Sequence, residues 1–359
     1  MRRRSRTKCS AGIEARAVDP RAGPVARYYE CLPDGDIRCR LCPRRCVIRD
    51  GGAGACRVRS NSGGTMTLPF YGMASAVSAD PIEKKPLYHF MPGSATYSVG
   101  YLGCNLRCPF CQNHGISQRT DAPTWRVEPA GLVAEARAAR CPSLAHTYSE
   151  PLAHAEFVVD CMKAAREAGL ANVLVTNGCC GEEAAADVLS LCDAVNVDVK
   201  AWDEGFYREE LGGDLNSVKR FVMMAVEYDV HVEATTLVIP GKNDDPAQID
   251  AIAGFLAALS PDIPYHLSAY HPMYRYTIPA TKASTLRSLA DLARRRLRYV
   301  YSGNLPGERS LTLCRACGAV LVSRMGYAVD ASGLRGCRCA SCGEPSPIHG
   351  ARKKNQKCP

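Results

Sequence analysis

Three closely spaced cysteines, Cys104, Cys108 and Cys111, are the residues of this sequence best suited to chemistry. Three thiolates on a [4Fe–4S] cluster leave one iron without a protein ligand, and that open position can bind another molecule. The alternative is a zinc site that takes its fourth ligand from a nearby histidine such as His114. The context, YSVGYLGCNLRCPFCQN, is an extended run that ends at Gly103 and continues into a turn-rich loop. We therefore expect a metal-binding loop at the carboxyl end of a first β-strand.

Two Cys-x2-Cys pairs near the C-terminus have the spacing of a zinc ribbon, because each pair is followed by glycine and 21 residues separate them. Four thiolates complete a tetrahedral structural zinc site. A segment this short cannot bury a core of its own, so the metal would supply the free energy of folding. The sequence between the pairs predicts two short strands and a turn. The predicted zinc ligands are Cys314, Cys317, Cys339 and Cys342.

A third group of cysteines lies near the N-terminus, in the segments CRLCPRRC and GGAGACRVR. Four thiolates on a glycine-rich, turn-forming segment suit either zinc or an iron–sulfur cluster. Spacing alone does not choose between the two metals, and unliganded thiols are the third alternative. This group consists of Cys39, Cys42, Cys46 and Cys56. The adjacent pair Cys179–Cys180 is expected to be buried, with a redox or radical-relay role as the alternative.

The composition is that of a globular protein, since 46% of the 359 residues are hydrophobic and 23% are charged. No apolar run approaches the roughly 18 residues that a membrane-spanning helix needs, and we expect no membrane partner. The basic start, MRRRSRTKCSAG, has no apolar segment behind it. We therefore expect a cytoplasmic protein without a secretory signal, in which clustered thiols hold metals.

The net charge of +9 is concentrated at the two ends. Residues 1–30 contribute +5 and residues 336–359 contribute +4, so the rest of the chain is neutral. A nucleic-acid groove needs positive charge on the body of the fold. The distribution therefore favours two solvated basic tails, and nucleic acid is not an expected partner.

Strand-like and helix-like segments alternate over residues 96–303. This alternation predicts an α/β fold whose parallel sheet curves into a partial (β/α)6 TIM-like barrel, followed by a terminal strand. Asp245 is expected to cap a helix that starts at Pro246 and runs to about Leu259. The predicted organisation is a basic extension over 1–30, an N-terminal Cys-rich metal module over 31–95, the partial barrel over 96–305, a C-terminal zinc ribbon over 306–345 and a basic tail over 346–359.

Polar residues follow the predicted strands at the same end, which in α/β barrels carries the active site. The second strand ends in Tyr148-Ser149-Glu150 and the third in Thr176-Asn177-Gly178. Later strands end near Asp198 and Lys200, and near His266. We expect these strand ends to meet beside the loop of three cysteines.

The sequence resembles the radical SAM superfamily, and within it the radical SAM enzyme of the AmmeMemoRadiSam system, which is close to the activating enzymes of the pyruvate formate-lyase type. The resemblance covers roughly residues 26–345. It rests on GCNLRCPFCQN, on the leading CRLCPRRC with GGAGACRVR, and on DPIEKKPLYHFMPGS, TYSEP, VTNG, DVKAW, LVIPGKND and the final Cys-x2-Cys pairs. The family pattern usually has asparagine where this chain has Ser149, so an amide-specific contact at that position is in doubt.

This resemblance implies a [4Fe–4S] cluster on Cys104, Cys108 and Cys111 whose fourth iron binds S-adenosylmethionine (SAM). Reductive cleavage of SAM would then give a 5′-deoxyadenosyl radical that abstracts hydrogen from an unidentified substrate, which could be a protein. The implied SAM contacts are Phe110 at the adenine, Ser149 and Glu150 at the methionine amino group, and Asn177, Asp198 and Lys200 on the ribose and carboxylate side. His266 is a further candidate, with a packed histidine inside the barrel as the alternative.

The implied enzyme is oxidoreductase-like and needs an electron donor of the flavodoxin or ferredoxin type. Its other implied partners are a protein substrate or the other components of the AmmeMemoRadiSam system. Three alternatives remain: an activating enzyme for a glycyl-radical partner, a nucleic-acid binding or modifying metalloprotein, and a metal scaffold without turnover. The segment DPIEKKPLYHF belongs to the family pattern but has no assigned role. An equal interpretation is that its charged residues Asp80, Glu83, Lys84 and Lys85 form a solvated, salt-bridged turn.

Overall fold

The structure is a computed structural model that describes residues 23–350. The predicted basic extension before residue 23 and the predicted tail after residue 350 lie outside the described residues. The centre of the molecule is an eight-stranded open sheet in the order β15-β14-β13-β12-β11-β10-β8-β7. Its strands are β7 (Ala76–Pro81), β8 (Ala95–Gly100), β10 (Ser143–Thr147), β11 (Ala171–Thr176), β12 (Ala194–Asp198), β13 (His231–Val238), β14 (Tyr265–Ala269) and β15 (Val300–Gly303).

The strands β8 and β10 to β15 are all parallel to one another, as the alternation of segments predicts. The register places Gly100 opposite Thr147 and Thr176 opposite Val197. The carboxyl ends therefore meet at one edge of the sheet. The mixed α/β fold with a central parallel sheet is thus confirmed. The sheet is open because β15 and β7 form its two edges.

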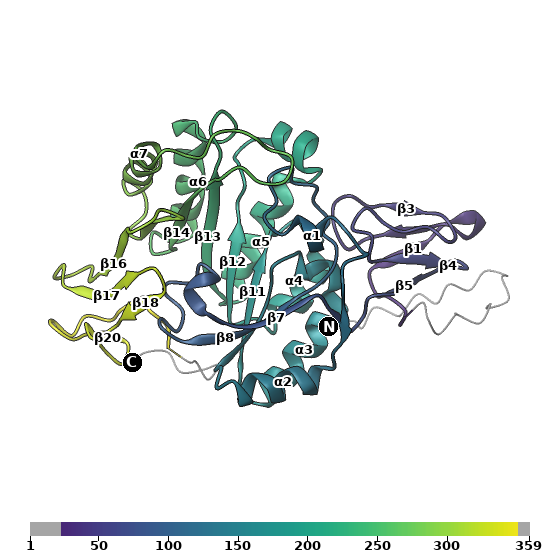
Figure 1. Cartoon of the computed structure of the whole chain (residues 1–359), viewed down its shortest axis with the longest axis horizontal. Coiled ribbons are helices and arrows are strands. Elements are labelled where there is room, and N and C mark those ends of the chain that lie inside the picture. The colour runs from purple at the N-terminus through teal and green to yellow at the C-terminus, as the bar shows by residue number, and fades with distance from the viewer. Residues whose placement is uncertain (1–22, 351–359) are drawn as a thin grey trace.

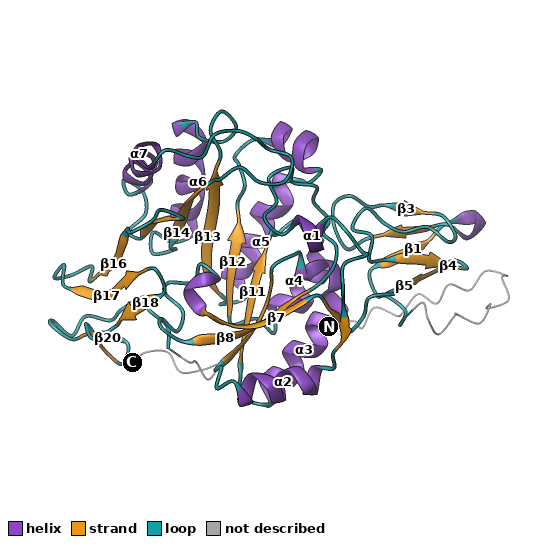
Figure 2. Ribbon diagram, in the orientation of Figure 1, coloured by secondary structure: helices purple, strands orange, loops and turns teal. Residues whose placement is uncertain are grey.

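Six helices connect successive parallel strands and cover the sheet (Figure 2). In α6, Asp245 accepts a hydrogen bond from the backbone N–H of Ala247 at 2.9 Å, and Pro246 takes the first helical position. This confirms the predicted cap, and the helix ends at Leu259 as expected. The helices are α2 (Pro129–Ala138), α3 (Ala155–Glu167), α4 (Glu182–Leu189), α5 (Leu215–Glu227), α6 (Pro246–Leu259) and α7 (Ala283–Ala293).

The N-terminal module and the C-terminal ribbon lie at opposite ends of the long axis (Figure 1). The module is held to the sheet region by Arg59, which is fully buried and forms a bidentate ion pair with Glu156 of α3 at 2.8 Å. The module strands are β1 (Tyr29–Cys31), β2 (Ile37–Cys39), β3 (Val47–Ile48), β4 (Ser60–Ser62) and β5 (Thr65–Thr67). A further pair joins β6 (Met73–Ala74) to β9 (Trp125–Arg126).

The ribbon contains the two predicted strands between its cysteine pairs, which are β17 (Val320–Met325) and β18 (Ala328–Asp330). β17 pairs antiparallel with both β16 (Arg309–Leu313) and β18, and β19 (Leu334–Arg335) pairs with β20 (Arg338–Cys339). The buried Arg324 of β17 donates to the backbone carbonyl of Tyr88 and lies 3.7 Å from Glu83. The ribbon therefore packs on the segment that follows β7.

The expectation of a solvated turn at residues 80–85 is wrong. Asp80 and Lys85 are 4% and 1% exposed, because Asp80 accepts hydrogen bonds from Lys84, Lys85 and the Tyr148 hydroxyl. Asp80 belongs to β7, which pairs antiparallel with β8 at the edge of the main sheet. The sheet therefore begins before the expected boundary at residue 96. None of the helices in residues 23–350 is long and apolar enough to cross a membrane.

Candidate active site

The three-cysteine loop leaves the carboxyl end of β8 and ends at α1 (His114–Ser117). Cys108 is buried, whereas Cys104 and Cys111 are partly exposed. Backbone hydrogen bonds fix the loop from three directions: Gly103 N to Ile116 O at 2.8 Å, Arg107 N to Leu211 O at 2.9 Å, and Arg275 N to Pro109 O at 2.8 Å. The structure thus places the loop at the predicted edge of the sheet.

The separation of the sulfur atoms argues against a preformed zinc site in this loop. A Zn–S bond of about 2.3 Å places the sulfurs of a tetrahedral site about 3.8 Å apart. Within residues 23–350, the only group of three or more His, Cys, Asp or Glu ligand atoms that all lie within 4.8 Å of one another is the C-terminal set of four cysteines. His114 contacts the Cys111 carbonyl at 3.2 Å and stacks on Tyr274. Three unbonded thiols with wider spacing fit a cubane cluster better than a single ion.

Hydrogen bonds of Asn105 and Asn177 connect the cysteine loop to the end of β11. The side-chain amide of Asn177 donates to Asn105 Oδ1 at 2.9 Å and lies 3.7 Å from the Cys104 sulfur. The Asn105 amide donates in turn to the backbone carbonyl of Cys179 at 2.6 Å. Asn177 is therefore beside the loop as expected, and it positions Cys104. Asn105 was missed by the sequence analysis, although it directly follows a predicted ligand.

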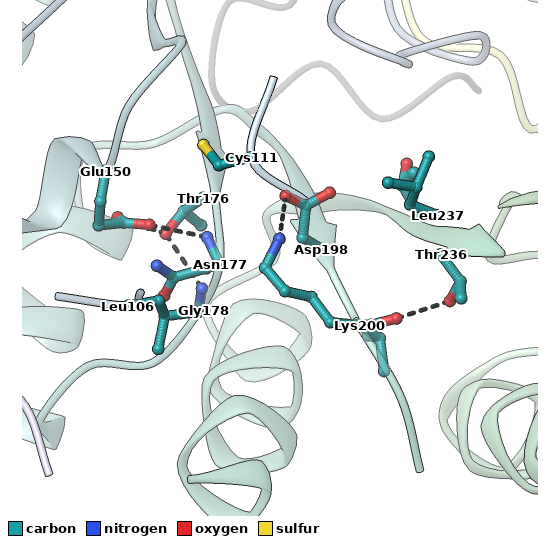
Figure 3. A network of polar contacts seen from close by, with 12 residues as sticks. Leu106, Cys111, Glu150, Thr176, Asn177, Gly178, Asp198, Lys200, Thr236 and Leu237 are labelled. Carbon is teal, nitrogen blue, oxygen red and sulfur yellow. Dashed lines mark hydrogen bonds and ion pairs between the residues drawn. The ribbon is translucent and has the colours of Figure 1, made fainter. Parts of the chain in front are cut away.

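Glu150 is 1% exposed, and both of its carboxylate oxygens accept hydrogen bonds from protein groups (Figure 3). It accepts from Thr176 Oγ1 at 2.7 Å, Asn177 N at 2.8 Å and Leu152 N at 2.9 Å. Burial raises the pKa of Glu150 to about 7, and these donors oppose that shift. In this structure Glu150 joins the ends of β10 and β11.

The neighbouring Ser149 offers the unpaired polar atom at this strand end. Its hydroxyl is buried and has no hydrogen-bond partner among the described residues. The preceding Tyr148 has a φ of 69°, which is rare for a residue with a side chain. Its ring lies over the Lys85 ammonium, and its hydroxyl donates to Asp80. The sequence analysis did not assign Asp80 and Lys85 to this region. Their charges within the motif DPIEKKPLYHFMPGS were the signal that could have indicated it.

Asp198 and Lys200 form an ion pair at 3.0 Å at the end of β12 (Figure 3). Burial alone would lower the pKa of Lys200, but the Asp198 carboxylate and the Cys108 sulfur raise it above its ordinary value. Burial raises the pKa of Cys108 to about 12, and the Lys200 ammonium opposes this shift. A cation with an acidic partner therefore lies beside the buried cysteine of the loop.

Phe110 is 5% exposed and belongs to an aromatic cluster. Its ring is parallel to that of Phe206 at 6.4 Å and tilted against that of Tyr276 at 5.7 Å. An open hollow of about 300 Å³ lies beside Phe206 and is lined also by Glu210 and Lys242. The Phe110 side of the loop therefore combines flat apolar surface with nearby polar groups.

His266 does not stand at a strand end, so this expectation is wrong. It is the second residue of β14 and is 3% exposed. Its Nε2 lies 2.6 Å from the buried Glu233, which also contacts His231 and accepts from the backbone N–H groups of Tyr88 and His89. The structure therefore places His266 in a packed network inside the sheet region. Sequence could not show this, because the network joins segments that are distant in the chain.

The other predicted cysteines lie in two separate places. The C-terminal four have sulfur separations of 3.7 Å between Cys314 and Cys342 and between Cys317 and Cys339. The N-terminal four are buried except for Cys46, which is partly exposed. Cys179 and Cys180 are buried, with the Cys180 sulfur donating to the Leu41 carbonyl at 3.4 Å.

Comparisons with known proteins agree with this geometry. Residues 98–251 match the model of the radical SAM superfamily. The uncharacterized protein MJ0808 of Methanocaldococcus jannaschii is 37% identical over 331 residues, which cover 90% of this chain and 98% of that protein.

Two solved structures are also similar to this chain. A domain of a pyruvate-formate lyase-activating enzyme from Bacteroides vulgatus has a TM-score of 0.40 and 21% identity, covering 45% of this chain and 99% of that domain. SuiB of Streptococcus suis bound to S-adenosylmethionine has a TM-score of 0.46 and 15% identity, covering 60% of this chain and 50% of SuiB. The match over residues 98–251, which include the loop of three cysteines at the carboxyl edge of the parallel sheet, shows that the chain contains a radical SAM superfamily domain.

Proposed function

We propose that this chain is a radical SAM enzyme that holds a [4Fe–4S] cluster on Cys104, Cys108 and Cys111 and binds SAM at the remaining iron. The observation that carries the proposal is a loop with three unbonded thiols, which do not form a compact group, at the edge where the strand ends converge. When bound, the cluster and SAM supply a 5′-deoxyadenosyl radical, which abstracts a hydrogen atom from the substrate.

The residues around the loop have separate tasks in this proposal. Asn177 and Asn105 hold the loop in one conformation, and the Asn177 amide lies near the Cys104 sulfur. The Ser149 hydroxyl, which is buried without a hydrogen-bond partner in the described residues, would contact the methionine amino group. Both carboxylate oxygens of Glu150 accept hydrogen bonds from the protein. Glu150 therefore holds the backbone near Ser149 and Asn177 in place.

The charged pair at the end of β12 suits the polar parts of SAM. Lys200 stays protonated because its pKa is raised, so it can pair with the methionine carboxylate. Asp198 keeps free acceptor capacity for a ribose hydroxyl, since one of its oxygens binds Lys200 at 3.0 Å. The ring of Phe110, supported by Phe206, provides the apolar surface for the adenine and excludes water from the loop.

We further assign the chain to the AmmeMemoRadiSam group on its motifs, with zinc in the C-terminal four-cysteine site and a flavodoxin- or ferredoxin-like electron donor. The ribbon supports the zinc assignment, because its sulfur separations of 3.7 Å match those of a tetrahedral site. The substrate remains unidentified.

The test is reductive cleavage of SAM. Anaerobically reconstituted chain, given dithionite and SAM, should form 5′-deoxyadenosine, measured by chromatography. The Cys108→Ala variant should fall to the background rate because the cluster loses a ligand. The matched control is Cys161→Ala, which removes a buried thiol in α3. Absence of product from a fully loaded, reduced sample would contradict the proposal.

A further inference from the structure

The N-terminal group of four cysteines packs directly on the loop of the candidate active site. A Cβ atom added to Gly103 would lie only 2.4 Å from the backbone carbonyl oxygen of Cys56. Gly103 also has a φ of 79°, which glycine adopts without strain. Gly103 directly precedes Cys104, so the two cysteine groups approach each other through the backbones of Gly103 and Cys56, beside the side chain of Val58.

A second contact joins the same two regions. The carbonyl of Leu41, which lies between Cys39 and Cys42 in sequence, accepts a hydrogen bond from Gly181 N at 2.8 Å. The guanidinium of Arg44 donates to the backbone carbonyl of Asn105 at 2.7 Å. The N-terminal group is therefore fixed against both the cysteine loop and the chain that follows β11.

A backbone N–H group is directed at one sulfur atom of the N-terminal group. Ala55 N donates to the sulfur of Cys46, the partly exposed cysteine, at 3.4 Å. N–H donors directed at sulfur are typical of thiolates that bind metal, and they tune iron–sulfur clusters.

The spacing of the sulfur atoms favours an iron–sulfur cluster over a single zinc ion at this site. No three of the four sulfurs, which all belong to the described residues, lie within 4.8 Å of one another. A tetrahedral zinc site needs separations of about 3.8 Å. The four irons of an iron–sulfur cluster lie at separate corners, so their cysteine ligands lie farther apart than those of one zinc ion. Four thiolates supply one ligand to each iron of a [4Fe–4S] cluster.

We propose that Cys39, Cys42, Cys46 and Cys56 hold a second [4Fe–4S] cluster that passes single electrons to the cluster on the three-cysteine loop. The metal site stands on its own geometry, whereas its role as a relay rests on the proposed function. A low-potential one-electron carrier protein would be oxidised by one electron, and the second cluster would be reduced by it and then reoxidised by the cluster on Cys104, Cys108 and Cys111. No covalent bond is formed or broken in this transfer.

The surface around the site suits an acidic carrier protein. Arg45, Arg49 and Arg57 are exposed and form no ion pair with any residue in the described range. Cys46 is the partly exposed ligand of the group. Positive charge around the entry point speeds association with a negatively charged partner.

The experiment counts metals in three anaerobically purified full-length chains. The wild-type chain should contain about eight irons, from two four-iron clusters. The loop variant Cys104→Ala/Cys108→Ala/Cys111→Ala should keep about four, and the module variant Cys39→Ala/Cys42→Ala should keep about four. Cys192→Ala, which changes a buried cysteine elsewhere in the core, is the matched control and should keep about eight.

Two measurements keep the test decisive if the module variant fails to fold. Mössbauer spectra of the wild-type chain count the clusters without any substitution, and Cys46→Ser is a milder change at the partly exposed ligand. A wild-type chain with about four irons, all lost in the loop variant, and two zinc ions would overturn the second cluster and leave the proposed function intact. A wild-type chain with only about four irons, all of which remain in the loop variant, would instead contradict the proposed function and leave the second cluster intact.

Discussion

The chain carries two sets of four cysteines that differ in spacing, burial and surroundings. In the C-terminal ribbon the sulfurs form a compact group, two of the cysteines are exposed, and the site lies at one end of the molecule (Figure 1). In the N-terminal module the sulfurs are wider apart, three cysteines are buried, and the site touches the loop of the candidate active site. We propose that the same number of thiolates serves two purposes. A compact, peripheral set suits a structural ion, and a wide set against a catalytic loop suits electron transfer.

Removing the ribbon metal should have the largest energetic effect. Structural zinc contributes about 10–16 kcal/mol of apparent binding free energy at neutral pH. The Cys317→Ser variant should lose one zinc and unfold locally over residues 314–345, as measured by hydrogen exchange. Its rate of 5′-deoxyadenosine formation should stay within about twofold of the wild-type rate with dithionite, because the ribbon is not part of the proposed site. A loss of iron in this variant would break the distinction between the two sets.

The N-terminal module should depend on a buried ion pair for its attachment. Arg59 and Glu156 have side chains that are 0% and 7% exposed, and removing one partner of such a pair costs about 3–5 kcal/mol. Arg59→Met should therefore lower the free energy of unfolding by that amount, measured in urea. The double variant Arg59→Met/Glu156→Leu should recover most of the loss. If the single variant is as stable as wild type, the module is not held in this way.

The same pair predicts a dependence on acid. Burial alone would raise the pKa of Glu156, but the Arg59 guanidinium and backbone donors hold it below its ordinary value of 4.5. In acid the unfolded chain then binds more protons than the folded chain, so stability rises with pH. The contribution is present above pH 4.5 and is lost as the pH falls below it. Urea unfolding at a series of pH values should show a smaller acid loss in the double variant than in wild type.

Much of this architecture could be predicted from the sequence, because local patterns carry it. The alternation of segments gives the parallel strands, and Asp245 with Pro246 gives the start of α6. The spacing of the C-terminal cysteines gives the compact group that the structure contains. These features depend on residues that are close together in the chain.

The errors came from contacts between distant segments. Asp80 is buried because Lys85 and Tyr148 both contact it, and Tyr148 is 68 residues away. His266 is held by Glu233 on the neighbouring strand, 33 residues away. The contact between Gly103 and Cys56 likewise depends on how the module docks, which spacing within either group does not reveal.

The smallest predicted effect concerns the arginine rim of the N-terminal module. Arg45→Ala/Arg49→Ala/Arg57→Ala should slow cluster reduction by an acidic carrier protein by about three- to tenfold at low salt. Reduction by dithionite should not change, because that small reductant does not need to dock on the rim. Stopped-flow absorbance at several salt concentrations measures both rates. If reduction by dithionite slows equally, the arginines do not act by docking the carrier protein, and the prediction is wrong.

The most direct test of the central claim is Mössbauer spectroscopy of iron-57-labelled, anaerobically purified chain with and without SAM. The claim is that three thiolates at Cys104, Cys108 and Cys111 leave one iron open to SAM. We predict that adding SAM shifts the signal of a single iron per chain, and that this shift disappears in Cys108→Ala while the signal of the N-terminal cluster persists. Spectra that do not respond to SAM, or an ion saturated by four protein ligands at this loop, would contradict the account.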